Sequence, residues 1–306
     1  DALELSKSLV SISECMNNQH VETISSLEIL VSDNASDDST PSLIAEFAKS
    51  NPKVKTFRQA SNLGFRGNME FLASQAAGEW ILYMSCGDTL IPDYDFRDVF
   101  EMCRKTTTDT IFYNYEMLDV QTGRRFRNET SALHDQVSQS DLIYSAAPFP
   151  LFKTDRLKEI ILDQKPLTGD WWPQIEWALA ASSKSGLAAY MELGPLTGNR
   201  PSAGWWSKPF AFAATIEMAK LLQGMASRHA ASVKLLTDAK KTWQSLPLWV
   251  FQTKVVFGNS ATLQDFRLLA PNVKHAPVPV IASLLILLTP TVILEGIRQL
   301  TWRFQS

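Results

Sequence analysis

The feature that most constrains the fold is an alternation of helical and strand patterns over the first 120 residues. Apolar side chains recur at helical spacing over residues 3–17 and predict an amphipathic helix there; they are Leu5, Leu9, Ile12 and Met16. Runs typical of buried strands follow at residues 27–32, 54–58, 80–85 and 109–118. Strands separated by helices usually pair in parallel. We therefore expect an α/β fold with a doubly wound, mostly parallel sheet flanked by helices.

Net charge and the spacing of the cysteines exclude some classes of protein as expectations. The 306 residues carry 29 Lys and Arg against 32 Asp and Glu, a net charge of −3. Nucleic-acid-binding proteins usually show a basic excess, so we expect no nucleic-acid partner. The three cysteines form no CxxC pair and the four histidines do not cluster in sequence. A disulfide framework and a structural zinc site are therefore disfavoured, and we expect a cytoplasmic location. Residues 1–19 lack the pattern of a signal peptide.

Two polar loops follow predicted strands, where parallel sheets bind ligands. Asp33 comes directly after the strand at residues 27–32, and its carboxylate can accept hydrogen bonds from a nucleobase or a ribose. The alternative is a cluster of helix N-cap residues before Pro41. Residues 62–68 follow the next strand, and their glycines would let the backbone approach a phosphate that Arg66 neutralises. The alternative here is an ordinary connection between a strand and a helix.

Two further carboxylates are candidates for chemistry. Asp88 follows the third predicted strand and can hold a divalent cation that bridges a diphosphate; alternatively, it caps a turn before Pro92. Asp170 stands beside two tryptophans in the segment GDWWPQIE at residues 169–176. An apolar site makes a carboxylate more basic, so Asp170 is a candidate general base, and the indoles could stack on sugar rings. The alternative is a helix start capped by Asp170, with the tryptophans in the core.

The C-terminal third of the chain reads as helical. Residues 208–245 predict a long helix or a helical hairpin, interrupted at Gly224. Residues 276–294 carry no charge, but three prolines lie in or beside this stretch, which disfavours a single membrane span. Residues 295–304 mix two arginines with apolar and aromatic residues, as interfacial helices do. Residues 276–304 therefore either lie at a membrane surface or pack as a buried helix pair.

Taken in order, these segments resemble glycosyltransferase family 2, the GT-A-fold sugar-nucleotide transferases. LEILVSDNASDDST at residues 27–40 looks like the family motif EIIVSDNGSTDGT, and NLGFRGN at 62–68 looks like NxGxxxN. AGEWI at 77–81 looks like AxGEYI, and residues 85–88 stand where the DxD-type metal motif belongs. The resemblance covers residues 3–118 strongly and 151–206 more weakly. Residues 169–173 and 198–205 look most like the abequosyltransferase branch, which serves bacterial O-antigen assembly.

The resemblance implies a role for individual residues. Donor-nucleotide contacts would come from four of them: Asp33, Asn62, Arg66 and Asp88. Asp88 would also hold a divalent cation, Mn²⁺ or Mg²⁺. Asp170 would deprotonate the acceptor hydroxyl, with Glu176 as the reserve candidate. Contacts to the acceptor or the transferred sugar would come from Trp171, Trp172, Arg200 and Trp205.

Two departures from the family pattern matter. The family's first strand, with its nucleotide contacts, does not appear before Asp1, and we expect the natural protein to carry it upstream. The metal motif keeps only Asp88, because Ser85, Cys86 and Gly87 replace acidic positions. We therefore expect a weakened dependence on metal.

The resemblance also implies a domain arrangement and an activity. Residues 1–207 would form the GT-A-like catalytic domain and residues 208–306 a helical C-terminal region. The activity would be the inverting transfer of a hexosyl or deoxyhexosyl group from a nucleotide-sugar to a hydroxyl of a lipid-linked glycan. The reaction would take place at the cytoplasmic face of the membrane, in bacterial surface polysaccharide synthesis. The alternative is a degenerate GT-A-like scaffold protein of a polysaccharide assembly complex. A nucleotidyltransferase or hydrolase would need an N-terminal glycine-rich phosphate loop, and none is visible.

Overall fold

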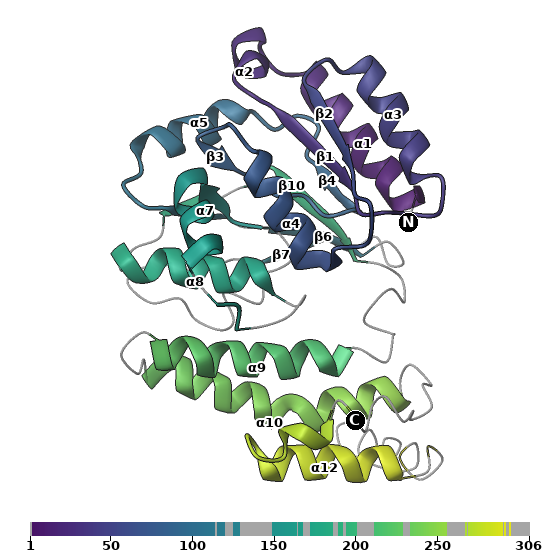
Figure 1. Cartoon of the computed structure of the whole chain (residues 1–306), viewed down its shortest axis with the longest axis vertical. Coiled ribbons are helices and arrows are strands. Elements are labelled where there is room, and N and C mark those ends of the chain that lie inside the picture. Colours follow the sequence, from purple (N-terminus) through teal and green to yellow (C-terminus); the bar gives the residue numbers. More distant parts are fainter. Residues whose placement is uncertain are drawn as a thin grey trace. The chain divides into compact units, whose positions relative to one another are not determined.

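The computed structural model of the chain divides into two compact units, Asp1–Arg200 and Pro201–Ser306 (Figure 1). The residues that it describes are 2–113, 115–119, 125–128, 149–163, 165–167, 172–185, 189–191, 194–200, 211–228, 233–255, 267, 269–289, 291 and 294. The expected domain boundary between residues 207 and 208 stays a prediction.

The first unit begins with alternating helices and strands, as the sequence pattern predicts. The elements are α1 (Ala2–Asn17), α2 (Val21–Ser25), β1 (Ile29–Asp33), α3 (Thr40–Ser50), β2 (Val54–Arg58) and α4 (Gly64–Gln75). Strands β1 and β2 pair in parallel, with Ile29 opposite Val54 and Asp33 opposite Arg58. Pro41 lies in the first turn of α3, where its missing N–H costs no helical hydrogen bond. The register places the ends of β1 and β2 side by side.

Two four-stranded sheets complete the first unit. The remaining elements are β3 (Trp80–Ile81), β4 (Asp88–Leu90), α5 (Phe96–Lys105), β5 (Thr110–Tyr113), β6 (Tyr115–Asp119), β7 (Arg125–Asn128), β8 (Leu151–Lys153), α7 (Thr154–Asp163), α8 (Pro173–Ser185), β9 (Ala189–Met191) and β10 (Leu196–Arg200). The strand orders are β4-β10-β6-β7 and β3-β8-β5-β9. Pairs β10/β6 and β5/β9 are parallel, whereas β10/β4, β3/β8, β5/β8 and β6/β7 are antiparallel. Among the described strands, antiparallel partners therefore join the parallel pairs.

The strand expected at 27–32 is shifted to Ile29–Asp33, and two other predicted strands differ more strongly from those observed. The strand expected at 80–85 covers only Trp80–Ile81: its ladder with β8 ends at the pair Ile81–Phe152, although β8 continues to Leu151. The strand expected at 109–118 is divided into β5 and β6, which belong to different sheets. Both strands are rich in β-forming residues, so the sequence pattern alone does not mark the change of sheet.

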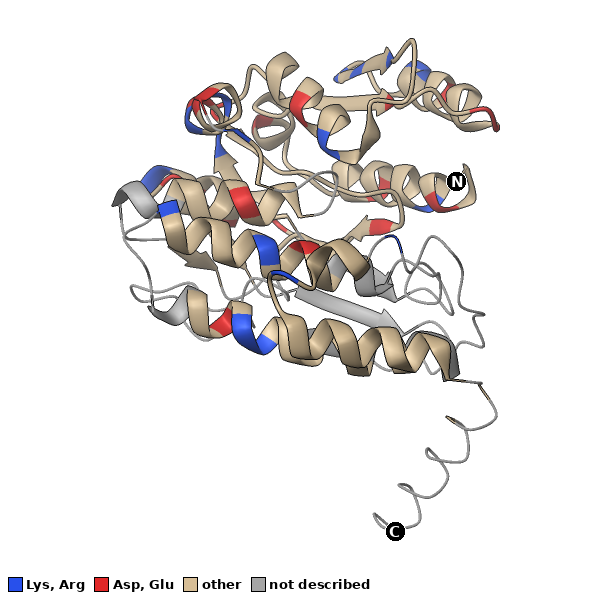
Figure 2. Cartoon of the chain, turned by 60° about the horizontal axis from the view of Figure 1, so that its bottom comes forward, with Lys and Arg blue, Asp and Glu red and all other residues tan. Residues whose placement is uncertain are grey.

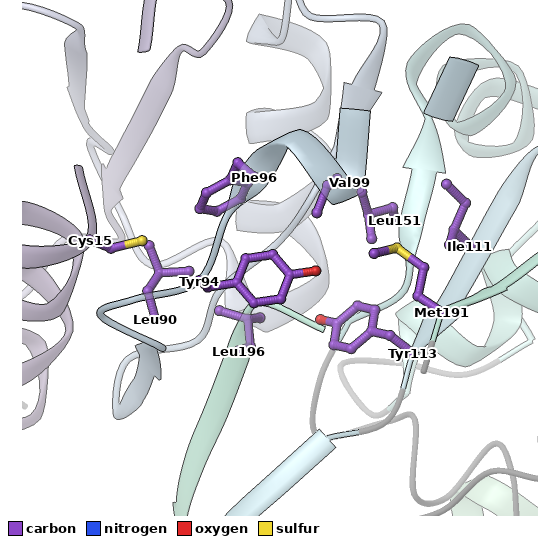
Figure 3. Packing of buried hydrophobic residues seen from close by; sticks show 10 residues of the cluster. All are labelled: Cys15, Leu90, Tyr94, Phe96, Val99, Ile111, Tyr113, Leu151, Met191 and Leu196. Carbon is purple, nitrogen blue, oxygen red and sulfur yellow. The ribbon is translucent and has the colours of Figure 1, made fainter. Parts of the chain in front are cut away.

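The core of the first unit gathers side chains from α1, α5 and both four-stranded sheets (Figure 3). Its buried members are Cys15, Leu90, Tyr94, Phe96, Val99, Ile111, Tyr113, Leu151, Met191 and Leu196. The Tyr113 hydroxyl satisfies its polarity by donating to the carbonyl oxygen of Phe149 at 2.8 Å. This core holds β4 against α1. It thereby also holds Asp88, the first residue of β4, in place.

The second unit is helical in all its described parts. It contains α9 (Ala211–Arg228), α10 (Val233–Val255), the 3₁₀ helix η2 (Ala270–Asn272) and α12 (Pro277–Leu288). The predicted hairpin is present, but the break expected at Gly224 is wrong: α9 continues through Gly224 and ends at Arg228. Neighbouring residues Leu221, Leu222 and Met225 are buried, so tertiary packing outweighs the low helix propensity of one glycine.

Helix α12 begins with prolines rather than being interrupted by them. Pro277 and Pro279 lie in its first turn, where proline is tolerated. Val280 and Leu287 pack with Trp243, Leu246 and Val250 of α10. No helix in the described parts of the chain is long and apolar enough to cross a membrane.

Candidate functional site

Asp33 lies at the carboxyl end of β1 with its side chain buried. Its Oδ1 accepts a hydrogen bond from the Ser36 N–H at 3.0 Å, and its Oδ2 lies 3.5 Å from Arg58 Nε. Among the described residues, Oδ2 has no hydrogen-bond partner. Asp38, not Asp33, bonds the N–H at the start of α3, because its Oδ1 accepts from Thr40 N at 2.9 Å. The helix-cap interpretation therefore fits Asp38, whereas Asp33 Oδ2 is a buried oxygen whose described neighbour is the Arg58 guanidinium.

The loops after β1 and β2 are joined by a pair of asparagines. Asn34 Nδ2 donates to Asn62 Oδ1 at 2.9 Å and to the Gly64 carbonyl oxygen at 3.0 Å. Asn34 Oδ1 accepts from the Leu63 N–H, and Asn62 Oδ1 accepts from the Gly64 N–H. The structure thus brings together Asp33 and Asn62, two residues expected at the nucleotide. The sequence analysis did not single out Asn34, although its place next to Asp33 was a signal.

A left-handed backbone supports the first loop. Ala35 has φ 62°, a conformation that costs a residue with a Cβ about 1 kcal/mol or more and that glycine adopts freely. The family motif places glycine at this position. Ala35 therefore adopts a backbone conformation that suits the glycine of the motif, at a cost in backbone strain.

Glu28, at the other end of the same motif, bonds the AGEWI segment. Its Oε1 accepts from the Ala77 N–H at 2.6 Å and from the Gly78 N–H at 2.8 Å, while Lys55 Nζ lies 3.2 Å from Oε2. Burial opposes ionisation of Glu28, but these hydrogen bonds and Lys55 outweigh it and lower its pKa from 4.5. Glu28 therefore has a structural role: it ties β1 to the segment before β3.

Asp88 begins β4 and is held in place by α1. Its Oδ2 accepts from the Ser85 N–H at 3.1 Å, so it does cap a turn. Ser8 Oγ donates to the Asp88 carbonyl oxygen at 2.7 Å and accepts from the Gly87 N–H at 3.0 Å. Ser11 Oγ accepts from the Leu90 N–H at 3.0 Å. The sequence analysis missed Ser8 and Ser11; the signal was two hydroxyls three residues apart on an amphipathic helix.

Asp88 provides one carboxylate for a metal ion. In the described ranges, no three His, Cys, Asp or Glu side chains gather as a metal-binding group. A cation that bridges a diphosphate needs only one or two protein carboxylates, because phosphate oxygens and water supply the other ligands. The donor set therefore fits Mg²⁺ or Mn²⁺ bound together with a nucleotide. On the neighbouring strand, Gly198 of β10 lies opposite Asp88, two residues before Arg200.

Arg66 and Glu176 form a buried ion pair between α4 and α8. Arg66 Nη2 donates to Glu176 Oε2 at 2.6 Å, and both side chains are buried. Glu176 Oε1 accepts from the Leu167 N–H at 2.9 Å, and the guanidinium lies 5.8 Å from the centre of the Trp177 ring. The nucleotide role of Arg66 and the reserve base role of Glu176 stay predictions. The geometry brings these two residues together, with the carboxylate of one neutralising the guanidinium of the other.

The residues expected to contact the acceptor are described in part. Trp172 precedes α8, and its carbonyl oxygen accepts from the N–H groups of Ile175 and Glu176. Its φ of 62° is strained for a bulky residue, and such strain is characteristic of functional sites. Arg200 is placed on β10 by its backbone alone. Asp170, Trp171 and Trp205 lie outside the described residues.

The fold and the loops at its strand ends define a GT-A-type α/β protein, the fold of nucleotide-sugar transferases. The chain belongs to glycosyl transferase family 2, whose pattern matches residues 6–161. A glycosyl transfer function follows from this membership.

Solved structures agree on the fold. TarS of S. aureus in complex with UDP-GlcNAc matches with a TM-score of 0.60 and 14% identity, over 96% of this chain and 88% of that one. The mannosyltransferase PcManGT of Pyrobaculum calidifontis, in complex with GDP-Man and Mn²⁺, matches with a TM-score of 0.57 and 14% identity, over 94% of this chain and 84% of that one. The comparison with curated proteins gives no match.

Proposed function

We propose that the protein transfers a sugar from a nucleotide-sugar to a hydroxyl of a glycan acceptor with inversion at the anomeric carbon. The observation that carries this proposal is Asp33: a buried carboxylate at the end of a parallel strand whose Oδ2 has no hydrogen-bond partner among the described residues. Nucleobase and ribose groups supply the donors that such an oxygen lacks. The neighbouring Asn34–Asn62 pair fixes the shape of the loop around it.

The roles of the other residues follow from chemistry. Asp170 would accept the proton of the acceptor hydroxyl, which then attacks the anomeric carbon as the nucleoside diphosphate departs. Asp88 would hold a divalent cation, whose charge stabilises the leaving diphosphate. The solved relatives bind UDP-GlcNAc, and GDP-Man with Mn²⁺, which supports a nucleotide-sugar donor and a divalent cation here. Trp171, Trp172, Arg200 and Trp205 would contact the acceptor or the transferred sugar.

The acceptor and the setting complete the proposal. The likeness of residues 169–173 and 198–205 to the abequosyltransferase branch supports a deoxyhexosyl donor and a lipid-linked glycan acceptor in bacterial surface polysaccharide synthesis. With such an acceptor the reaction would take place at the cytoplasmic face of the membrane. The C-terminal region would keep the protein close to that surface.

Donor binding by Asp33 can be tested by thermal shift with UDP-, GDP-, CDP- and dTDP-sugars, with and without Mn²⁺. One of these donors should raise the melting temperature of the natural protein, because ligands that bind only the folded state stabilise it. Asp33→Asn should lose this shift, since the amide replaces one of the two acceptor oxygens with an NH2 group that only donates. Asp37→Asn, an exposed change in the same loop, is the matched control and should keep it. Equal shifts in the two variants would exclude Asp33 from the donor site.

Asp88 is the single acidic residue left in the metal motif. This favours a second candidate function, a GT-A-like scaffold that binds donor or glycan without turnover. Asp170→Asn distinguishes the two. An enzyme should lose transfer and keep the thermal shift by the donor, because the base acts on the acceptor. A natural protein that binds the donor but transfers no sugar to any glycan acceptor tested would favour the scaffold.

A further inference from the structure

The two units carry opposite net charge. Residues 1–200 contain 18 Lys and Arg against 28 Asp and Glu, a net charge of −10. Residues 201–306 contain 11 against 4, a net charge of +7, which together gives the −3 of the whole chain. Such a separation is typical of a chain whose basic part meets an anionic surface.

The exposed charges of the second unit are basic wherever the structure describes them. They belong to Arg228, Lys240, Lys241, Arg267 and Lys274. The described acids in this unit, Glu217 and Asp238, are not exposed. Figure 2 shows how Lys and Arg and how Asp and Glu are distributed over the described chain. The surface of this unit therefore attracts anions through several separate positions.

Helix α12 combines a packed face with an exposed apolar face. Val280, Ser283 and Leu287 are buried on one side. On the other side an apolar stripe with helical spacing faces solvent, with exposed fractions of 76%, 47%, 59% and 67% at Val278, Ile281, Leu285 and Leu288. At 100° per residue these four side chains fall within a narrow arc of the helix surface. No charged residue occurs in α12. An apolar face of this kind costs free energy in water unless something covers it.

We propose that this α12 stripe lies in the headgroup region of an anionic lipid bilayer, with the basic residues around it contacting the lipid phosphates. Lys274 precedes α12 by three residues, and Lys240 and Lys241 lie on α10, against which α12 packs. Apolar insertion and attraction to anionic lipid reinforce one another in interfacial helices. Charge disfavours the same stripe of a second copy as the occupant, because pairing two such units would bring two charges of +7 together.

The length of α12 determines its orientation on the membrane. Twelve residues span about 18 Å, well below the roughly 30 Å of a hydrocarbon core, so the helix lies on the bilayer rather than across it. This inference deepens the membrane proximity included in the proposed function, and it names the face and the lipid charge. It needs no transferase activity, so it can be tested on its own.

The test is co-sedimentation of the full chain with vesicles. Binding should be stronger to phosphatidylcholine vesicles containing about one quarter phosphatidylglycerol than to phosphatidylcholine alone, and it should weaken as salt rises. Leu285→Glu should lower binding to the anionic vesicles about tenfold or more, because one inserted leucine is lost and a repelled charge is gained. Leu162→Glu is the matched control, since Leu162 is an exposed leucine of the acidic unit on α7. It should bind like the natural protein.

Several results would overturn the inference: no sedimentation with anionic vesicles, equal binding of the two glutamate variants, or insensitivity to salt. A dimer in light scattering that Leu285→Glu converts to a monomer, with vesicle binding unchanged, would assign the stripe to a second copy. If Leu285→Glu lowers the melting temperature, Val278→Glu replaces it, because Val278 is the most exposed position of the stripe. The thermal shifts with sugar donors report separately on Asp33. A negative vesicle result would therefore not contradict the donor site, and a negative donor result would not contradict the membrane role of the α12 stripe.

Discussion

At the scale of single residues, Gly194 has the least room for a side chain among the glycines compared in the described parts of the chain. A Cβ at position 194 would stand 1.8 Å from Tyr113 Cδ2, and the buried ring is held by its hydroxyl bond to Phe149. Gly194→Ala should therefore lower the free energy of unfolding by about 1–3 kcal/mol, because the ring and the backbone must separate. Urea unfolding at neutral pH measures the change.

The matched control for this prediction is Gly78→Ala. A Cβ at position 78 would meet its nearest atoms at 3.5 and 3.7 Å, which is ordinary van der Waals contact. A smaller side chain at position 113 gives a further check: in a Tyr113→Leu background, Gly194→Ala should cost less than it does beside the natural tyrosine. Equal losses for the two alanine variants would mean that the ring moves away without cost.

Glu28 is a second residue whose effect can be measured, through pH. Its pKa is lowered in the folded state, so the stability that it contributes is present above the unfolded value near 4.5 and is lost as pH falls through the folded pKa. Glu28→Gln should lower the free energy of unfolding by about 1 kcal/mol at neutral pH, because bonds to a charged acceptor are stronger than bonds to a neutral one. The difference from the natural protein should shrink when urea unfolding is repeated at acid pH.

Glu46→Gln is the control for Glu28. Glu46 pairs with Lys49 on the surface of α3, where both side chains are largely exposed, and such pairs contribute little. Its substitution should leave the stability nearly unchanged at every pH. A Glu28→Gln deficit that persists undiminished at low pH would contradict the assignment of the effect to the carboxylate charge.

At the scale of elements, the ion pair between Arg66 and Glu176 links α4 to α8. Removing one partner leaves the other charge buried, so Glu176→Gln should cost about 3–5 kcal/mol in the free energy of unfolding. Arg66→Met should be costly for the same reason. The double variant should lose less than the sum of the two, which a double-mutant cycle by urea unfolding measures. Strictly additive losses would show that the two side chains act independently.

Glu70→Gln is the matched control on the same helix. Glu70 Oε1 lies 3.6 Å from Arg66 Nη1 and its side chain is partly exposed, so its pairing with Arg66 is the weaker one. We expect Glu70→Gln to cost well below Glu176→Gln. A similar cost for both would mean that the buried guanidinium depends equally on either carboxylate.

The elements also show what the sequence could and could not predict. The helix at 3–17 and the strand at 54–58 are confirmed almost to the residue, because each is a local pattern with strong periodicity. Strand β3 ends where its ladder with β8 ends, and the helix break at Gly224 does not occur because neighbouring packing prevails. Both outcomes depend on contacts distant in sequence, which a local pattern does not contain.

At the scale of the whole molecule, family motifs predicted the fold class and the family, since each motif specifies a turn at a strand end. Asp33 and Asn62 were expected together, and they lie in adjacent loops joined by Asn34. Arg66 and Glu176 were given separate roles, because nothing in either segment indicates its partner 110 positions away. The exposed stripe of α12 also escaped prediction, since a wholly apolar segment does not reveal which of its faces is covered.

The same ion pair has a consequence for the order of folding during synthesis. A ribosome releases Arg66 long before Glu176, and at ordinary elongation rates the interval lasts roughly 5–20 s. During that time the guanidinium would be buried without its nearest carboxylate, which is costly, so α4 must keep this side chain hydrated. The first motifs of the chain can form their turns early, but the face of α4 that carries Arg66 closes only when α8 arrives. The two partners of this ion pair therefore meet only late in the synthesis of the first unit.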